Sequence, residues 1–232
     1  MRALSLIVVM TMSAHAADIS GTLQLAGRAP SIPMVSADVD LDVCGSEAKP
    51  LQSLVLGTNQ AVRDAVVYLG AASANRSDAA AVLAMHDCEF VPRVQIVRSG
   101  ATLVLRNCDS VLHVVRLESL SGTNGPATLL NVAAPYAGYE RKFKLANFME
   151  PTLLKASCGN GHGWMVAYLA VMPHFWAVMT DECGRFTLSG VPPGSYKLYA
   201  WHEVLGTLVR EIKVYGGRAT NVDLEFTSTV RK

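Results

Sequence analysis

The sequence predicts an all-β protein, and three features point to this class. Apolar and polar residues alternate over short segments, most cleanly at residues 196–201. Residues 165–171 form a continuous apolar run, which is typical of a strand buried on both faces. The segment Gly190-Val-Pro-Pro-Gly194 has the composition of a tight turn between two strands.

The strands expected in the first part of the chain are separated by short polar breaks. They fall at residues 19–25, 65–69, 91–97, 102–106, 113–117, 139–145, 153–157 and 165–171. Residues 121–125 have the composition of a turn. Residues 70–87 are rich in alanine with polar interruptions, so we expect a loop with one short helical piece there.

The pattern changes after Pro173, where short strands and turns follow one another closely. These strands are expected at residues 185–188, 196–201, 207–214 and 219–226. Such a series indicates a small antiparallel β-sandwich. We therefore expect one domain over residues 17–175 and a second over residues 176–232, packed together without a long linker.

Composition excludes several classes of protein. The 232 residues include 20 Lys and Arg against 19 Asp and Glu, so no basic excess is available to neutralise phosphates, and nucleic acid is not expected as a partner. Half of the residues are hydrophobic and 17% are charged, which excludes a disordered chain. The longest apolar run, residues 164–179, is interrupted by Pro173 and His174, so no membrane span is expected in the mature chain.

The first sixteen residues have the features of a secretory signal peptide. Arg2 precedes an apolar stretch over residues 3–12, and Ala14-His15-Ala16 fits the small-residue rule for cleavage after Ala16. The alternative is an ordinary buried N-terminal segment. Cleavage would export the protein, so we expect it in the periplasm or outside the cell, where disulfides persist.

The chain has five cysteines: Cys44, Cys88, Cys108, Cys158 and Cys183. An odd number in an exported protein leaves at least one thiol without a disulfide partner. A bound metal would protect such a thiol from oxidation, whereas the simpler alternative is a buried, inert cysteine.

One loop carries the side chains that indicate chemistry. Cys158, His162 and Met165 offer a thiolate, an imidazole and a thioether within eight residues. Soft sulfur with imidazole suits copper, and His₂Cys with a weak axial Met is the ligand set of blue-copper electron-transfer sites. His113, 45 residues upstream, is the natural second histidine. Zinc fits this set less well, because a structural zinc site would need more thiolates or histidines.

Several segments resemble a bacterial family of exported cupredoxin-like proteins, some of them labelled methylamine-utilisation proteins. The resemblance rests on Phe90-Val-Pro-Arg-Val, on the segment from Arg106 to His113, on residues 158–165, and on Val178-Met-Thr-Asp181 with Trp201-His-Glu203. It implies a plastocyanin-like Greek-key β-sandwich followed by a carboxypeptidase-regulatory-like, transthyretin-type sandwich. It also implies a type 1 copper centre with one copper ion, held by His113, Cys158, His162 and Met165.

The chain departs from the family pattern close to the ligands. The spacing Cys158-x₃-His162 has one residue more than the family's usual Cys-x₂-His, and Val114 replaces the asparagine that ties the two ligand loops together. Cys108 replaces a serine, which places it near the expected metal.

The resemblance further implies a structural disulfide between Cys44 and Cys88. Cys108 and Cys183 then either pair with each other or stay free. Around the metal we expect Asn107 and Asp109 to pin a ligand loop or orient a histidine ring. Trp164 either lines a rim where a partner docks or fills the core.

The remaining mature histidines, His86, His174 and His202, are not expected to be ligands. The sequence thus predicts an exported mononuclear copper protein that carries single electrons between redox partners of unknown identity, and not an enzyme. Electrons would pass through the ligand edge nearest to solvent, expected at His162. The alternative is a binding or structural module without a redox task, or a protein that stores or delivers copper.

Overall fold

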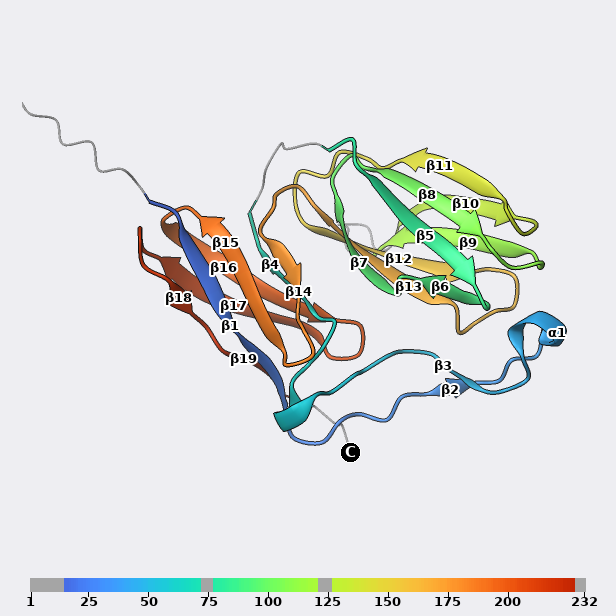
Figure 1. The fold of residues 1–232 in the computed structure, drawn as a ribbon, viewed down its shortest axis with the longest axis horizontal. Coiled ribbons are helices and arrows are strands. Elements are labelled where there is room, and N and C mark those ends of the chain that lie inside the picture. Colours follow the sequence, from blue (N-terminus) through green and yellow to red (C-terminus); the bar gives the residue numbers. More distant parts are fainter. Residues whose placement is uncertain (1–14, 72–76, 121–126, 228–232) are drawn as a thin grey trace, which may run out of the picture.

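The computed structural model describes residues 15–71, 77–120 and 127–227. Nearly all regular elements in these ranges are strands, so the all-β prediction is confirmed (Figure 1). The strands form two β-sandwiches, which we call the first and the second sandwich. The expected signal peptide, residues 1–16, lies outside the described residues except for its last two positions. The expected turn at residues 121–125 lies entirely outside them. The first described strand, β1, begins at Ala17.

The first sandwich consists of two mixed sheets. In one sheet the order is β10 (Ala127–Ala134), β9 (His113–Ser119), β12 (Thr152–Cys158), β13 (Val166–Met172) and β7 (Val94–Arg98). In the other the order is β11 (Glu140–Lys144), β8 (Thr102–Asn107), β5 (Ala80–His86) and β6 (Glu89–Val91). The chain crosses repeatedly between the sheets, and a shared apolar core lies between them, with Leu83, Leu103, Leu117 and Leu169 fully or almost fully buried.

The strand β5 corrects one expectation. Residues 70–87 were expected to form a loop with a helical piece, but residues 80–86 are a strand that pairs in parallel with β8. Alanine favours strands weakly, so local propensity gave no signal at Ala80 and Ala81. The burial of Leu83 and Met85, with the half-buried Ala84 between them, supplies the stabilisation that propensity lacks.

The second sandwich draws strands from both ends of the chain. One sheet has β1 (Ala17–Ala26) beside β15 (Arg185–Val191), β18 (Thr220–Asn221) and β19 (Leu224–Thr227). The other has the order β14 (Ala177–Met179), β4 (Val66–Leu69), β16 (Gly194–His202) and β17 (Gly206–Val214).

This pairing corrects the expected division of the chain. Residues 17–175 were assigned to the first domain, yet β1 and β4 pair with strands of the C-terminal module. Strands that neighbour each other in sequence usually neighbour each other in space, and that rule fails for β1 and β4. Alternation of residues identifies a strand but does not identify its partner.

The two sandwiches share an apolar contact. All seven residues of β13 are buried, as expected for a strand covered on both faces. Ala167, Leu169 and Val171 face the core of the first sandwich. Tyr168 and Met172 belong to a second cluster, which includes Val66, Tyr68 and Trp201 of the second sandwich.

A long connection joins β1 to β4. It contains β2 (Met34–Val35), α1 (Leu41–Cys44), β3 (Lys49–Pro50) and the short 3-10 helix η1 (Thr58–Gln60). It leaves the second sandwich and reaches the end of the first sandwich near β6, where α1 lies (Figure 1). Among the described residues, no helix is long and apolar enough to cross a membrane.

Candidate metal centre

The loop after β12 folds back on itself and so brings together the candidate ligands that lie between Cys158 and Met165. The Met165 backbone N–H donates to the His162 carbonyl at 3.0 Å, and the Cys158 N–H donates to the Met165 carbonyl at 3.3 Å. Gly161 has φ +84°, a conformation that side chains other than glycine's rarely adopt. The tight return places Cys158 and His162 on the same side of the loop.

Strand pairing brings His113 to this loop although it stands 45 positions before Cys158. His113 begins β9, which pairs with β12 so that Cys158 lies opposite Val115. Two hydrogen bonds tie the loops together: the Gly159 N–H donates to the Val114 carbonyl at 2.8 Å, and the Asn160 side chain donates to the Leu112 carbonyl at 3.0 Å. Asn160 and Gly159 therefore tie the two loops together.

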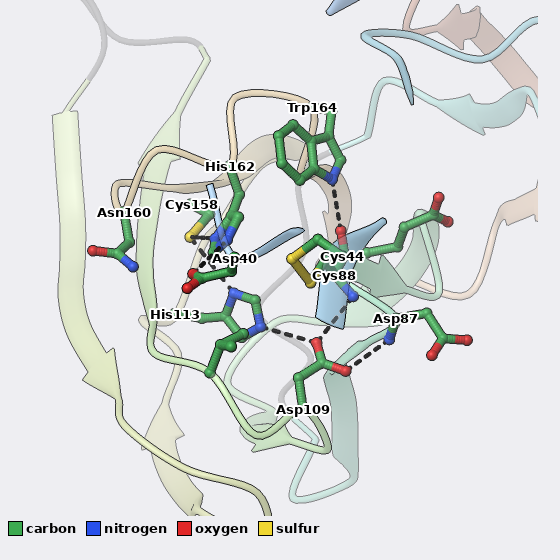
Figure 2. Close-up of a disulfide and its surroundings, with 12 residues drawn as sticks. Asp40, Cys44, Asp87, Cys88, Asp109, His113, Cys158, Asn160, His162 and Trp164 are labelled. Carbon is green, nitrogen blue, oxygen red and sulfur yellow. Dashed lines mark hydrogen bonds and ion pairs between the residues drawn. A yellow bond between two sulfur atoms is a disulfide. The ribbon is translucent and has the colours of Figure 1, made fainter. Parts of the chain in front are cut away.

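Three potential ligand atoms converge. The Cys158 Sγ lies 3.5 Å from Nδ1 of His162 and 3.8 Å from Nδ1 of His113 (Figure 2). Bonds of about 2.0–2.1 Å to nitrogen and about 2.3 Å to sulfur, at trigonal to tetrahedral angles, separate such donors by about 3.5–3.8 Å. The three side chains are therefore spaced as the ligands of one metal ion, and their ligand atoms all lie within 4.8 Å of one another.

Each histidine has its other ring nitrogen on a carboxylate. His113 Nε2 is 2.9 Å from an oxygen of Asp109, and His162 Nε2 is 3.1 Å from an oxygen of Asp40. An ionised carboxylate only accepts, so each Nε2 carries the proton and each Nδ1 presents its lone pair toward Cys158. Partners of this kind orient metal-binding imidazoles and raise their basicity.

The site is closed to solvent. His113 and His162 are both 0% exposed, and Cys158 is 9% exposed. The expectation that His162 is the ligand nearest to solvent is wrong, because its ring is fully buried whereas Cys158 keeps some exposure. Asp40 covers the Nε2 side of that ring. Burial lowers the pKa of His113, which keeps its imidazole neutral, and burial raises the pKa of the Cys158 thiol. A metal that binds here would displace the thiol proton.

Met165 and Trp164 are both buried in the core of the first sandwich. Trp164 is 2% exposed, its ring lies edge-on to His162, and its Nε1 donates to the Cys88 carbonyl at 2.8 Å. Trp164 therefore fills the core and forms no exposed docking rim. Met165 is 1% exposed, and its backbone bonds to both Cys158 and His162 hold it on the ligand loop.

Asn107 and Asp109 hold the loop that precedes His113. The Asn107 amide donates to the carbonyls of Val111 and Ala134, and its oxygen accepts from the Asp109 N–H. Asp109 accepts from the N–H groups of Asp87 and Cys88 in addition to its bond with His113. Asn107 thus pins the loop, and Asp109 both pins it and orients the ring.

The structure contains the one disulfide that the resemblance implied. Cys44 and Cys88 form a disulfide, which lies beside the two histidines (Figure 2). Cys108 and Cys183 are free and exposed, so they do not pair with each other in this structure. The disulfide suits an oxidising compartment.

The other histidines lie outside the cluster of ligand atoms. His86 is exposed and pairs with Asp87, His174 Nε2 is within 2.9 Å of the Leu69 carbonyl, and His202 Nδ1 accepts from the Val204 N–H.

Asp40 is the site residue that sequence reasoning missed. It stands four residues before Cys44, so the implied disulfide already placed it near the core of the first sandwich. Its role as partner of His162 had no motif of its own.

Comparison with known proteins gives one family match and several structural similarities. No curated protein matches the chain. Residues 156–222 match the family model described as polysaccharide lyase family 4, domain II. That segment runs from β12 to β18. The family model that it matches is not a carboxypeptidase-regulatory-like domain, which was the expectation.

Among solved structures, a purple cupredoxin from Nitrosopumilus maritimus is 21% identical, with a TM-score of 0.31 over 40% of this chain and 99% of that chain. Amicyanin from Paracoccus versutus is 14% identical, with a TM-score of 0.32 over 45% and 96%. A copper-containing nitrite reductase from Thermus scotoductus is 17% identical, with a TM-score of 0.31, and the match covers 39% of this chain and 21% of that chain. Similarities of this size carry no conclusion about fold or function.

Proposed function

We propose that this chain is an exported protein that binds one copper ion and carries single electrons between redox partners. The observation that supports the proposal best is the convergence of Nδ1 of His113, Sγ of Cys158 and Nδ1 of His162 in a closed site. Two imidazoles and a thiolate are the in-plane ligands of blue-copper sites. Met165, on the same loop, would supply a further, weakly bound sulfur ligand.

The chain's own residues hold this donor set in place. Hydrogen bonds between the two ligand loops and carboxylates on both imidazoles restrict movement of the ligands. When bound, copper would supply a change of oxidation state by one electron. A rigid, buried ligand set keeps the rearrangement that accompanies such a change small. No group placed for acid–base or nucleophilic catalysis is part of this proposal, so the protein is not proposed to be an enzyme.

The leader-like N-terminus and the disulfide support a location in the periplasm or outside the cell. The proposed partner is another redox protein. The resemblance to exported cupredoxin-like proteins adds to the proposal, and membership of that family is part of it.

A second function is favoured by one specific observation. Both imidazoles are 0% exposed and Asp40 covers Nε2 of His162, so neither histidine edge is open to a partner in this structure. A protein that holds and delivers copper would need the ion shielded in this way. Fast electron exchange between the loaded protein and a small redox reagent would favour the carrier, and slow exchange with reversible copper transfer would favour delivery.

The test of copper binding is an electronic spectrum with metal analysis on the exported, purified protein. We expect one copper per chain and a strong visible thiolate-to-copper band. Cys158→Ser should abolish the band, whereas Cys183→Ser, which removes an exposed free thiol, should leave it intact. Met165→Leu should keep the colour and raise the reduction potential. A coloured Cys158→Ser protein would show that the ligand assignment is wrong.

A further inference from the structure

The connection between β1 and β4 passes over the metal centre. We call residues 33–50 the cap; they contain β2, α1 and β3. Both ends of the cap lead back to the second sandwich, whereas α1 lies at the end of the first sandwich (Figure 1). The cap connects two strands of the second sandwich and covers a site in the first sandwich.

The cap packs directly against the ligand loop. Ala37 is buried in the core of the first sandwich, and Val35 and Val39 pack against it. A Cβ at Gly161 would lie 3.2 Å from the methyl groups of Val39, so the cap touches the loop between Cys158 and His162. This contact depends on the missing side chain at Gly161.

Asp40 is the part of the cap that reaches a ligand. Its carboxylate bonds Nε2 of His162, while its own side chain is 35% exposed and His162 is 0% exposed. Asp40 thus covers the Nε2 side of the imidazole, and Figure 2 shows it beside the ligand cluster. It is the cap's counterpart of Asp109, which the first sandwich itself supplies to His113.

The Cys44–Cys88 disulfide joins the end of α1 to the first sandwich, just after β5. The two sulfur atoms lie within 4.8 Å of a ring nitrogen of His162. Without this bond the cap would be held near the site by Asp40, by apolar contacts and by weak contacts of Lys49 with Glu89 and Trp164. A cap held by so few contacts would open more often than the sandwich below it.

We propose that residues 33–50 are a disulfide-latched cap that controls access to the metal centre, and that Asp40 is a positioning residue for His162. Reduction by a dithiol reductant would open the latch: the reductant gives two electrons and two protons, Cys44 and Cys88 become thiols, and the reductant becomes a disulfide. The cap then lifts while both of its ends stay attached to the second sandwich. The claim that the cap controls exchange of the metal rests on the proposed function. The claim that it controls access of small reagents to the site does not.

Access is tested in the metal-free protein by alkylation with iodoacetamide, followed at each cysteine by mass spectrometry. Cys158 contacts His162, the ring that Asp40 of the cap bonds, and the exposed Cys108 and Cys183 serve as internal references. In the double variant Cys44→Ser with Cys88→Ser we expect Cys158 to react roughly tenfold faster, because local opening becomes more frequent. The rates at Cys108 and Cys183 should not change. An unchanged rate at Cys158 in a folded double variant would overturn the proposal.

A second variant keeps the test decisive if loss of the disulfide impairs folding. Asp40→Ala retains the disulfide and should still accelerate alkylation of Cys158. Asp42→Ala, an exposed acid on the same helical turn with no role in the site, is the matched control. Equal rates for Asp40→Ala and Asp42→Ala would refute the assignment of Asp40.

Copper exchange is then measured on the loaded protein with a copper(I) chelator in excess. We expect release to be roughly tenfold faster with the latch removed, and faster with Asp40→Ala than with Asp40→Asn, since asparagine keeps an acceptor for His162. Equal release from latched and unlatched protein would contradict the cap. Failure of every form to bind copper would refute the proposed function and leave the alkylation result standing.

Discussion

Two carboxylates decide how the two imidazoles of the candidate metal centre are presented. Asp109 and Asp40 both accept from a histidine Nε2, which leaves each Nδ1 directed at the Cys158 sulfur. The sequence indicated Asp109 as a residue that pins the loop before His113 or orients a histidine ring. It did not indicate Asp40, because that contact crosses 122 residues and depends on the path of the cap.

Replacing Asp109 should weaken the metal centre through its partner. In Asp109→Ala, His113 loses the bond that orients its ring, and the N–H groups of Asp87 and Cys88 lose their acceptor. We expect copper affinity to fall by about 10- to 100-fold, as measured by competition with a chelator. Asp87→Ala, which removes an exposed neighbouring acid, is the control. Equal affinity in the Asp109 variant and wild type would show that this hydrogen bond does not orient the ligand.

A histidine far from the metal centre should make stability depend on pH. Burial lowers the pKa of His202 from its ordinary value of 6.5 to about 4. The unfolded chain therefore binds a proton near pH 6.5 that the folded chain does not bind until about pH 4. The full free energy of unfolding is therefore present above pH 6.5. It decreases progressively as the pH falls toward 4, by about 3 kcal/mol in total, because protonation of His202 then favours the unfolded chain.

The measurement is the free energy of unfolding in denaturant between pH 4 and pH 7.5. His202→Gln should flatten the slope over that window relative to wild type, and the exposed His86→Gln is the matched control. If the slopes for His202→Gln and wild type coincide, burial of His202 does not drive the pH dependence.

At the scale of elements, a strand was predicted correctly where its sequence of apolar and polar residues reflects which of its faces are buried. The apolar run that became β13 is buried at every position, and the alternating run that became β16 lies in the sheet of the second sandwich. The strand β5 was missed, because its alanines carry little propensity and its stability comes from pairing with β8. Long-range pairing is the information that a single segment does not contain.

The ligand loop depends on a glycine at one point. In Gly161→Ala, φ +84° costs about 1 kcal/mol, and the new methyl group meets Val39 of the cap at 3.2 Å. Gly138→Ala has a similar φ of +86° with nothing within 4 Å, so it carries the backbone cost alone. We expect Gly161→Ala to lower the midpoint of thermal unfolding more than Gly138→Ala. Equal shifts would mean that the cap yields to the methyl group without cost.

At the scale of the molecule, the two sandwiches are interwoven. The chain starts in the second sandwich with β1, sends the cap over the first sandwich, returns for β4, and builds the first sandwich before it completes the second. The sequence indicated two modules that pack together but placed the N-terminal strands in the wrong one. The residues proposed as metal ligands stood out in the sequence because they occupy one loop and one strand end of the first sandwich, whereas the closure of the site follows from the interweaving.

An ion pair between the sandwiches should couple their unfolding. Arg93, just before β7, bonds Glu203, just after β16, at 2.6 and 2.9 Å, and the Glu203 side chain is 2% exposed. Removal of Arg93 leaves the charge of Glu203 without its partner, which costs about 3–5 kcal/mol in a fully buried pair and less here, where the Arg93 side chain is 28% exposed. We therefore expect Arg93→Met to destabilise the protein strongly and to separate one calorimetric transition into two, because the contact between the sandwiches is weakened.

The exposed pair Arg106–Glu140 provides the comparison, since Arg106→Met at a solvated site should cost less than about 1 kcal/mol. Adding Glu203→Gln to Arg93→Met removes the unpaired carboxylate and should recover part of the loss, which a double-mutant cycle measures. If Arg93→Met costs no more than Arg106→Met and the single transition persists, the apolar cluster around Tyr168 and Trp201 alone joins the sandwiches. The ion pair would then contribute to the orientation of the sandwiches and not to their stability.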